Sequence, residues 1–260
     1  MTREIDPLQL NGILSERLGD RRLVFFLDYD GTLTSIVERP DLAVMDDDMR
    51  RTLKRLVKRH PVYVLSGRDM EDVRRRVGVE GVEFVGSHGF HLMESLPELD
   101  PEALDEAVAE LDAAADEIEQ WLDYIEGVLI ERKTYSFALH YRMVDRHDLQ
   151  QITSAAEDVL ERYGAVTSKK GKKVIEFVPD IPWDKGCCIQ VLLSRLNESG
   201  GAESYYPVCI GDDITDEDAF RVVTPETGLS ILVAEDSRDS AAEFRLPAPE
   251  AVRAFLDRIG

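Results

Sequence analysis

Four short runs of apolar residues limit the folds that this sequence can adopt. They are Leu23–Leu27, Val62–Leu65, Pro207–Ile210 and Leu229–Val233. Each run is continuous and does not alternate with polar residues, which is typical of parallel strands covered by helices on both faces. Amphipathic helical segments follow the runs. The sequence therefore predicts an α/β fold, with a doubly wound parallel sheet as a Rossmann-like core.

The middle of the chain has a different pattern. After a long amphipathic helix, Tyr135–Arg142 alternates between polar and apolar residues, which predicts a half-exposed strand. A helix over about 148–163 and a strand over Val174–Val178 follow. We therefore expect an inserted α+β domain between two halves of the core. The expected boundaries are 96–181 for the insertion, and 1–95 plus 182–260 for the core.

Composition excludes several functional classes. The 260 residues include 31 Lys and Arg against 52 Asp and Glu, a net charge of −21. Since nucleic acids and anionic lipids attract positive surfaces, we expect no nucleic-acid partner and no membrane partner. No segment has the apolar core of a signal peptide or the length of a transmembrane helix, so we expect a cytoplasmic location. Three cysteines form no disulfide framework and lack the spacing of a zinc site.

Acidic and polar side chains follow three of the predicted strands directly. Asp28 and Asp30 follow the first strand, Ser66 follows the second, and Asp212 and Asp213 follow the third. Ligands of open α/β sheets bind at the carboxyl ends of the strands. If these strands are neighbours, several carboxylates converge and repel one another. A divalent cation removes this conflict, and an oxygen-rich site suits Mg²⁺.

An aspartate at a strand end can also act as a nucleophile. It accepts a phosphoryl group, and water then hydrolyses the aspartyl-phosphate. The reaction needs a second acid for the leaving oxygen, a cation, and fixed donors for the phosphoryl oxygens. Asp28 fits the nucleophile, Asp30 fits the second acid, and the Asp212 region fits the site for the cation. Ser66 and Lys185 fit the fixed donors for the phosphoryl oxygens. Lys185 is the candidate lysine because it opens a predicted helix shortly before the strand that leads to Asp212.

Four ordered segments resemble the motifs of the haloacid dehalogenase (HAD) phosphatase superfamily. They are DYDGTL at 28–33, SGR at 66–68, DKG at 184–186 and GDDITDE at 211–217. The inserted domain is similar to the α+β cap of that superfamily. More narrowly, the chain resembles the trehalose-6-phosphate phosphatase family. The segments that carry this narrower resemblance are GSHG at 86–89, IERK at 130–133, HYR at 140–142 and VIE at 174–176.

The resemblance implies roles for residues of the core motifs. Asp28 is the nucleophile and a Mg²⁺ ligand. Asp30 is the general acid and base, and its backbone carbonyl binds the metal. Asp212 is the third protein ligand, and either Asp213 or Asp216 assists it. The resemblance leaves the choice between these two open.

It also implies a set of substrate-binding residues. Ser66 and Lys185 hold the phosphoryl group, and Arg68 supports that pocket. The residues expected to bind sugar hydroxyls or line the cleft are His88, Glu131, Lys133, Arg142 and Glu176. Two positions depart from the family pattern, since Val178 stands where Arg is frequent and Asp184 where Asn is frequent.

The implied function is Mg²⁺-dependent hydrolysis of trehalose 6-phosphate to trehalose and phosphate. The nearest alternative is a related phosphatase acting on sucrose 6-phosphate or mannosyl-3-phosphoglycerate. A different class is a non-catalytic sugar-phosphate sensor or regulatory subunit, against which the presence of both Asp28 and Asp30 argues. The expected partners are a small sugar phosphate and, through functional coupling, a trehalose-phosphate synthase.

Overall fold

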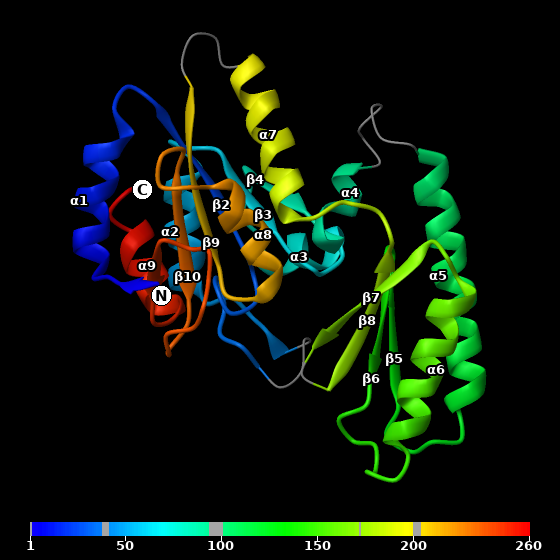
Figure 1. The fold of residues 1–260 in the computed structure, drawn as a ribbon. Helices are drawn as coiled ribbons and strands as arrows, with labels where there is room; N and C mark the ends of the chain where they lie inside the picture. Colours follow the sequence, from blue (N-terminus) through cyan, green and yellow to red (C-terminus); the bar gives the residue numbers. More distant parts are fainter. Residues whose placement is uncertain (1, 38–41, 94–100, 172, 200–203) are drawn as a thin grey trace. The chain divides into compact units, whose positions relative to one another are not determined.

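The computed structural model describes residues 2–37, 42–93, 101–171, 173–199 and 204–260. The chain divides into two compact units (Figure 1). The first unit contains Met1–Leu92 and Trp183–Gly260, and the second contains Met93–Pro182. The predicted boundary between residues 95 and 96 lies outside the described residues.

The first unit is built on a seven-stranded parallel sheet, which confirms the predicted doubly wound α/β fold. Its strand order is β1-β11-β10-β9-β2-β3-β4, and every pairing is parallel. The strands are β1 (Arg3–Glu4), β2 (Arg22–Leu27), β3 (Val62–Leu65), β4 (Val82–Val85), β9 (Tyr205–Gly211), β10 (Leu229–Val233) and β11 (Phe244–Leu246).

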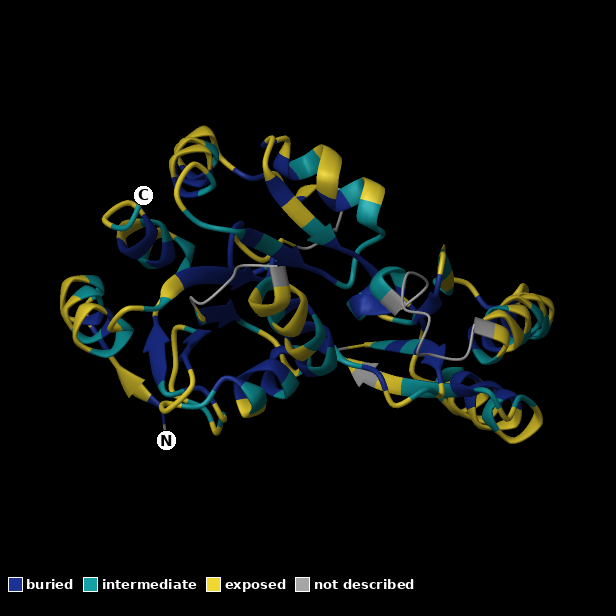
Figure 2. Ribbon diagram, turned by 90° about the horizontal axis from the view of Figure 1, so that it is seen from above, coloured by how far each residue is buried: buried dark blue, intermediate teal, exposed yellow. Residues whose placement is uncertain are grey.

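Helices flank this sheet, and its central strands are buried between them (Figure 2). In β2, Phe25 and Leu27 join the large hydrophobic core, whereas Val24 and Phe26 point to the opposite face and are equally buried. Burial of both faces explains why the strand is a continuous apolar run. The helices that contribute to the large core are α1 (Pro7–Leu18), α2 (Asp47–Leu56), α3 (Met70–Val77) and α9 (Pro249–Leu256).

The remaining helices of the first unit stand next to the polar motifs. Helix α7 (Lys185–Ser199) contacts β9 and packs against α8 (Glu217–Val222). The shorter helical elements are η2 (Ser87–Gly89), α4 (Phe90–Met93) and η3 (Ile214–Asp216). Asp184 accepts a hydrogen bond from the backbone N–H of Cys187 over 2.8 Å, which satisfies a free donor of the first turn of α7. This start fixes the position of Lys185.

The second unit is an antiparallel sheet covered by two helices. Strand order is β5-β6-β8-β7, and residues Phe137 and Phe177 of neighbouring strands stack with ring centroids 4.4 Å apart. These rings pack against residues of both helices. The elements are α5 (Pro101–Leu122), β5 (Leu129–Lys133), β6 (Ser136–His140), α6 (Leu149–Arg162), β7 (Val166–Gly171) and β8 (Val174–Pro179).

Among the helices that the structure describes, none has the combination of length and apolar character that crossing a membrane requires.

Burial predicts which leucines stabilise the first unit. Leu53 on α2 is fully buried in the large core, whereas Leu8 on α1 is 54% exposed. Leu53→Ala should lower the free energy of unfolding by about 2–5 kcal/mol, because it removes apolar contacts and leaves a cavity. The matched control Leu8→Ala should change it by less than about 0.5 kcal/mol. Urea unfolding followed by circular dichroism measures both, and equal losses would contradict this core assignment.

Candidate active site

The register of the sheet brings three motif residues to one edge. Leu27 at the end of β2 pairs with Val64 of β3 and with Ile210 of β9. The backbone N–H of Asp28 continues the ladder and donates to the carbonyl of Ile210 over 2.9 Å. Residues that directly follow these strands therefore share the carboxyl edge of the sheet, where ligands of such sheets bind. They are Asp28, Ser66 and Asp212.

A buried cluster of carboxylates surrounds one lysine at this edge. Oxygen atoms of Asp28, Asp212 and Asp216 lie within 4.8 Å of one another. The Nζ atom of Lys185 lies 2.6 Å from Oδ1 of Asp28 and 2.7 Å from Oδ1 of Asp216. Only 3% of Lys185 and 8% of Asp28 is exposed, so solvent screens these charges little.

The single ammonium of Lys185 does not balance the negative charge of the three carboxyl groups. Burial raises the pKa of Asp28 well above its usual value, and Asp216 and Asp212 add to this shift while Lys185 opposes it. Burial also raises the pKa of Asp212 to about 7, with help from Asp216. Although burial alone would lower it, the charges of Asp216 and Asp28 raise the pKa of Lys185. Three carboxylates thus share one ammonium, and a divalent cation fits this donor set.

Two glycines allow the carboxylates to approach one another. Gly31 has a φ of +80°, and a Cβ atom added to it would lie 2.1 Å from Oδ2 of Asp212. A Cβ atom at Gly211 would lie 2.1 Å from Cγ of Asp216. Both distances are far below a van der Waals contact, so neither position has room for a side chain.

The loop after β9 separates the roles of Asp213 and Asp216. Asp216 accepts hydrogen bonds from the backbone N–H groups of Asp212 and Asp213, both over 3.0 Å. Asp213 accepts from the backbone N–H of Ile214 over 2.6 Å and caps η3. Of these two aspartates, the one whose side chain lies in the carboxylate cluster is Asp216.

The second motif acid, Asp30, is held by an arginine. Nε and Nη2 of Arg68 each lie 2.7 Å from an oxygen of Asp30, so the two side chains form a bidentate ion pair. Asp72 of α3 accepts from Nη1 of Arg68 over 3.2 Å and from Nε of Arg76 over 2.7 Å. Arg68 was expected to support the phosphoryl pocket, and in this structure its guanidinium orients Asp30. The Asp30 side chain is 43% exposed, so it remains accessible to a substrate.

Ser66 and His88 lie next to each other in the fold. Ser66 is buried, and its Oγ accepts from the backbone N–H of Arg68 over 3.1 Å. The backbone N–H of His88 donates to the carbonyl of Ser66 over 3.0 Å. Ser87 and His88 have φ values of 50° and 54°, a left-handed conformation that is costly for such residues and frequent at functional sites. A Cβ atom at Gly67 would lie 2.6 Å from the His88 ring, so this imidazole sits directly on the SGR motif.

In the second unit, the predicted sugar-binding residues form hydrogen-bonded pairs. Nζ of Lys133 lies 2.8 Å from Oε1 of Glu176, and Oγ of Ser136 donates to the same oxygen over 3.3 Å. Nε2 of His140 lies 3.0 Å from Oε2 of Glu131. The hydrogen bond with His140 lowers the pKa of Glu131, and the charge of Lys133 adds to this effect. The structure therefore organises Glu131, Lys133 and Glu176 as one polar group.

These pairs share a face of the sheet, because Ala138 pairs with both Glu131 and Glu176. Arg142 is exposed in the turn after β6. Ser136 and His140 carried no assigned role in the sequence, although His140 stands in the HYR segment. Their period-two spacing with Ala138 was the signal that could have placed them beside the acidic side chains.

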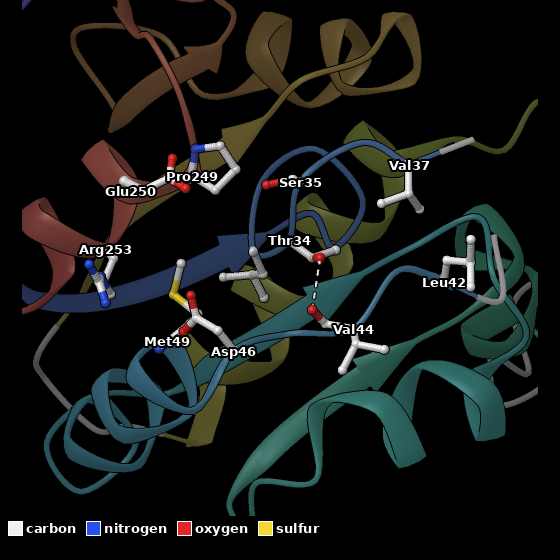
Figure 3. Close-up of a pocket in the computed structure, with 11 residues that line it drawn as sticks. Thr34, Ser35, Val37, Leu42, Val44, Asp46, Met49, Pro249, Glu250 and Arg253 are labelled. Atoms are coloured by element: carbon white, nitrogen blue, oxygen red, sulfur yellow. Dashed lines mark hydrogen bonds between the residues drawn. The ribbon is translucent and has the colours of Figure 1, made fainter. Parts of the chain in front are cut away.

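A pocket in the first unit begins at Leu33, the last residue of the DYDGTL motif. It is formed by the segment that follows the DYDGTL motif and by the start of α9, and Thr34 closes one side by donating to the carbonyl of Val44 over 3.3 Å (Figure 3). None of its lining residues is a predicted site residue. The lining residues are Leu33, Thr34, Ser35, Val37, Leu42, Val44, Asp46, Met49, Pro249, Glu250 and Arg253.

Comparison with known proteins adds evidence on the family. The family model described as trehalose-phosphatase matches residues 26–250. The trehalose-phosphate phosphatase of Mycobacterium tuberculosis is 40% identical over all of this chain. The chain spans 66% of that relative's length.

Solved structures show the same fold at lower sequence identity. The C-terminal domain of Candida albicans trehalose-6-phosphate phosphatase has a TM-score of 0.75 and 23% identity, covering 98% of this chain and 97% of that one. The C-terminal domain of the Candida albicans trehalose synthase regulatory protein has a TM-score of 0.72 and 12% identity, covering 98% and 99%. At these identities the likeness concerns the fold. The family match and the mycobacterial relative, together with the motifs at the carboxyl edge, show that this chain belongs to the trehalose-phosphatase family.

Proposed function

We propose that this protein hydrolyses trehalose 6-phosphate to trehalose and phosphate through an aspartyl-phosphate on Asp28. The observation that carries the proposal is the buried contact of Lys185 with Asp28 and Asp216 beside Asp212. An ammonium in this position stabilises the ionised form of Asp28, which is the form that attacks phosphorus. The same ammonium can hold a phosphoryl oxygen as negative charge develops.

Asp28 and Asp30 divide the chemistry. An oxygen of Asp28 attacks phosphorus, and the bond from phosphorus to the sugar oxygen breaks. In its protonated form, Asp30 gives a proton to that leaving oxygen, then takes a proton from the water that attacks the aspartyl-phosphate. In its ionised form, Asp30 is oriented by Arg68 through two hydrogen bonds of 2.7 Å. Ser66 at the neighbouring strand end holds the phosphoryl group together with Lys185.

Asp28 and Asp212, with the backbone carbonyl of Asp30, are the proposed ligands of Mg²⁺. When bound, this ion offsets the negative charge of the carboxylates and polarises the phosphoryl group. Asp216 assists by holding the backbone of Asp212, whereas Asp213 serves as the cap of η3. The raised pKa values of Asp28 and Asp212 support a cation here, because each reports uncompensated negative charge.

Glu131, Lys133 and Glu176 are the proposed sugar-binding residues. A sugar presents hydroxyls that both donate and accept, which suits carboxylates next to an ammonium. The pairs Lys133–Glu176 and His140–Glu131 hold these groups in place before the sugar arrives. His88 of the first unit and Arg142 of the second remain predicted substrate-binding residues.

Because the chain spans 66% of its mycobacterial relative, the activity of the whole protein is part of the proposal. A cytoplasmic location and functional coupling to a trehalose-phosphate synthase stay predictions. The sensor alternative stays testable as well, since the likeness to a regulatory protein concerns the fold. The presence of both Asp28 and Asp30 supports catalysis, because binding alone needs no acid and base pair.

A phosphate-release panel tests the function directly. We expect trehalose 6-phosphate to exceed sucrose 6-phosphate and mannosyl-3-phosphoglycerate in kcat/KM by at least about tenfold, because the sugar-binding groups would be left unpaired by the wrong sugar. Activity should vanish in EDTA and return with Mg²⁺. Faster release from either alternative substrate would reject the trehalose assignment, and no release from any of them would favour the sensor.

Asp28→Asn tests the covalent step. The amide keeps the shape of the side chain but cannot attack phosphorus, so kcat should fall by at least about 10³-fold. Circular dichroism and the melting temperature should show that the variant remains folded. Mass spectrometry after a rapid acid quench should detect a phosphorylated wild-type chain and no phosphorylated variant. Activity close to wild type in the variant would refute a nucleophilic role for Asp28.

Glu131→Gln tests the sugar site, with Arg132→Ala as a matched control on the same strand. Arg132 forms ion pairs with Asp116 and Glu119 of α5, so it faces away from Glu131. Glu131→Gln should lower kcat/KM for trehalose 6-phosphate by about tenfold, the value of one hydrogen bond to a charged group. It should leave p-nitrophenyl phosphate hydrolysis nearly unchanged, and Arg132→Ala should affect neither substrate. Equal losses on both substrates would argue against sugar recognition by Glu131.

A further inference from the structure

The backbone of Asp212 is held on both of its polar groups. Its N–H donates to Oδ2 of Asp216 over 3.0 Å, within the same loop. Its carbonyl accepts a hydrogen bond of 3.0 Å from Nη2 of Arg238, which comes from the segment between β10 and β11. Arg238 belongs to none of the motifs found in the sequence. A residue outside the recognised motifs therefore touches the backbone of a proposed metal ligand.

A buried glutamate holds Arg238 in turn. Nη1 of Arg238 lies 3.4 Å from Oε1 of Glu217, whose side chain is 8% exposed. The other oxygen of Glu217 accepts from the backbone N–H of Ala241 over 2.7 Å. Glu217 thus pairs with the guanidinium through its charge alone, without a hydrogen bond, and holds the backbone of the segment that carries Arg238. A carboxylate buried to this degree is stable only with such partners.

The Asp212 carboxylate has little freedom to adjust to these contacts. A Cβ atom on Gly31 would lie 2.1 Å from its Oδ2, so the DYDGTL loop closes one side. Asp216 and Arg238 hold the backbone N–H and carbonyl of Asp212. Mg²⁺ demands near-ideal octahedral geometry, so small displacements of a ligand weaken its binding.

We propose that Arg238 is a positioning residue for the metal site, acting through the carbonyl of Asp212, and that Glu217 holds it there. The inference rests on the proposed function for the identity of the ion. Two effects of Arg238 oppose each other. Its positive charge repels a cation, whereas its hydrogen bond keeps Asp212 in place. The side chain is 36% exposed, so solvent screens the repulsion, and the positioning effect dominates.

Because charge repulsion and positioning have opposite effects on Mg²⁺ binding, the direction of the change in Kd distinguishes them. Isothermal titration calorimetry of metal-free protein with Mg²⁺ measures the Kd without any substrate. Arg238→Ala should raise the Kd by about tenfold, the usual effect of losing a group that orients a metal ligand. Arg238→Lys keeps the charge but cannot span both acceptors, so its Kd should rise too. If charge repulsion dominated, Arg238→Ala would lower the Kd and Arg238→Lys would leave it unchanged, and this result would overturn the proposal.

Two controls assign the signal. Arg221→Ala on α8 breaks an exposed ion pair with Asp218 and should leave the Kd at the wild-type value. Asp212→Asn should abolish the binding that the calorimeter detects. A wild type that binds Mg²⁺ but releases no phosphate from trehalose 6-phosphate would refute the proposed function alone. Equal Kd values for wild type and Arg238→Ala would refute the positioning role alone, and a wild type that binds no Mg²⁺ would refute both.

Discussion

The buried ammonium of Lys185 is the interaction on which the arrangement of the core unit depends. It contacts Asp28 at the end of β2 and Asp216 in the loop after β9, and it projects from the first turn of α7. Removing such a charge from water is expensive unless it is paired with good geometry. The end of β2, the loop after β9 and the first turn of α7 must therefore be placed together, because each supplies a charge that the others pair. The parallel sheet supplies the meeting point, because it ends neighbouring strands at one edge.

Further polar contacts of the core unit hold the residues around Lys185 in place. Arg68 fixes the Asp30 carboxylate, and Arg238 fixes the backbone of Asp212. Each of these arginines is held by a further carboxylate, Asp72 for the former and Glu217 for the latter. Both arginines form partly exposed ion pairs, so these contacts matter for the geometry of the site more than for the stability of the fold. The site is thus an arrangement of charges in which the reacting groups have few alternative positions.

The sequence predicted the features that follow from local pattern. The four apolar runs, which lie in β2, β3, β9 and β10, could be located because burial of both strand faces leaves a continuous apolar signal. The candidate site residues directly after β2, β3 and β9 could be located with them. Contacts between distant segments could not be predicted. The choice between Asp213 and Asp216 depends on how η3 folds. The hydrogen bond from Arg238 to the carbonyl of Asp212 comes from a segment without a hydrophobic pattern. Strand β1 has two residues and exists only because β11 pairs with it.

Gly31 and Gly211 restrict how this site can change over evolutionary time. Each backbone lies directly against a carboxylate of the cluster, so any single substitution there displaces Asp212 or Asp216. A new geometry would require two segments, far apart in the chain, to change together. The side chains proposed to bind the sugar are held in a different way, by hydrogen bonds to other side chains such as those of the pairs Lys133–Glu176 and His140–Glu131. A single substitution in the inserted unit therefore leaves the carboxylate cluster of the core unit undisturbed, whereas one at Gly31 or Gly211 does not.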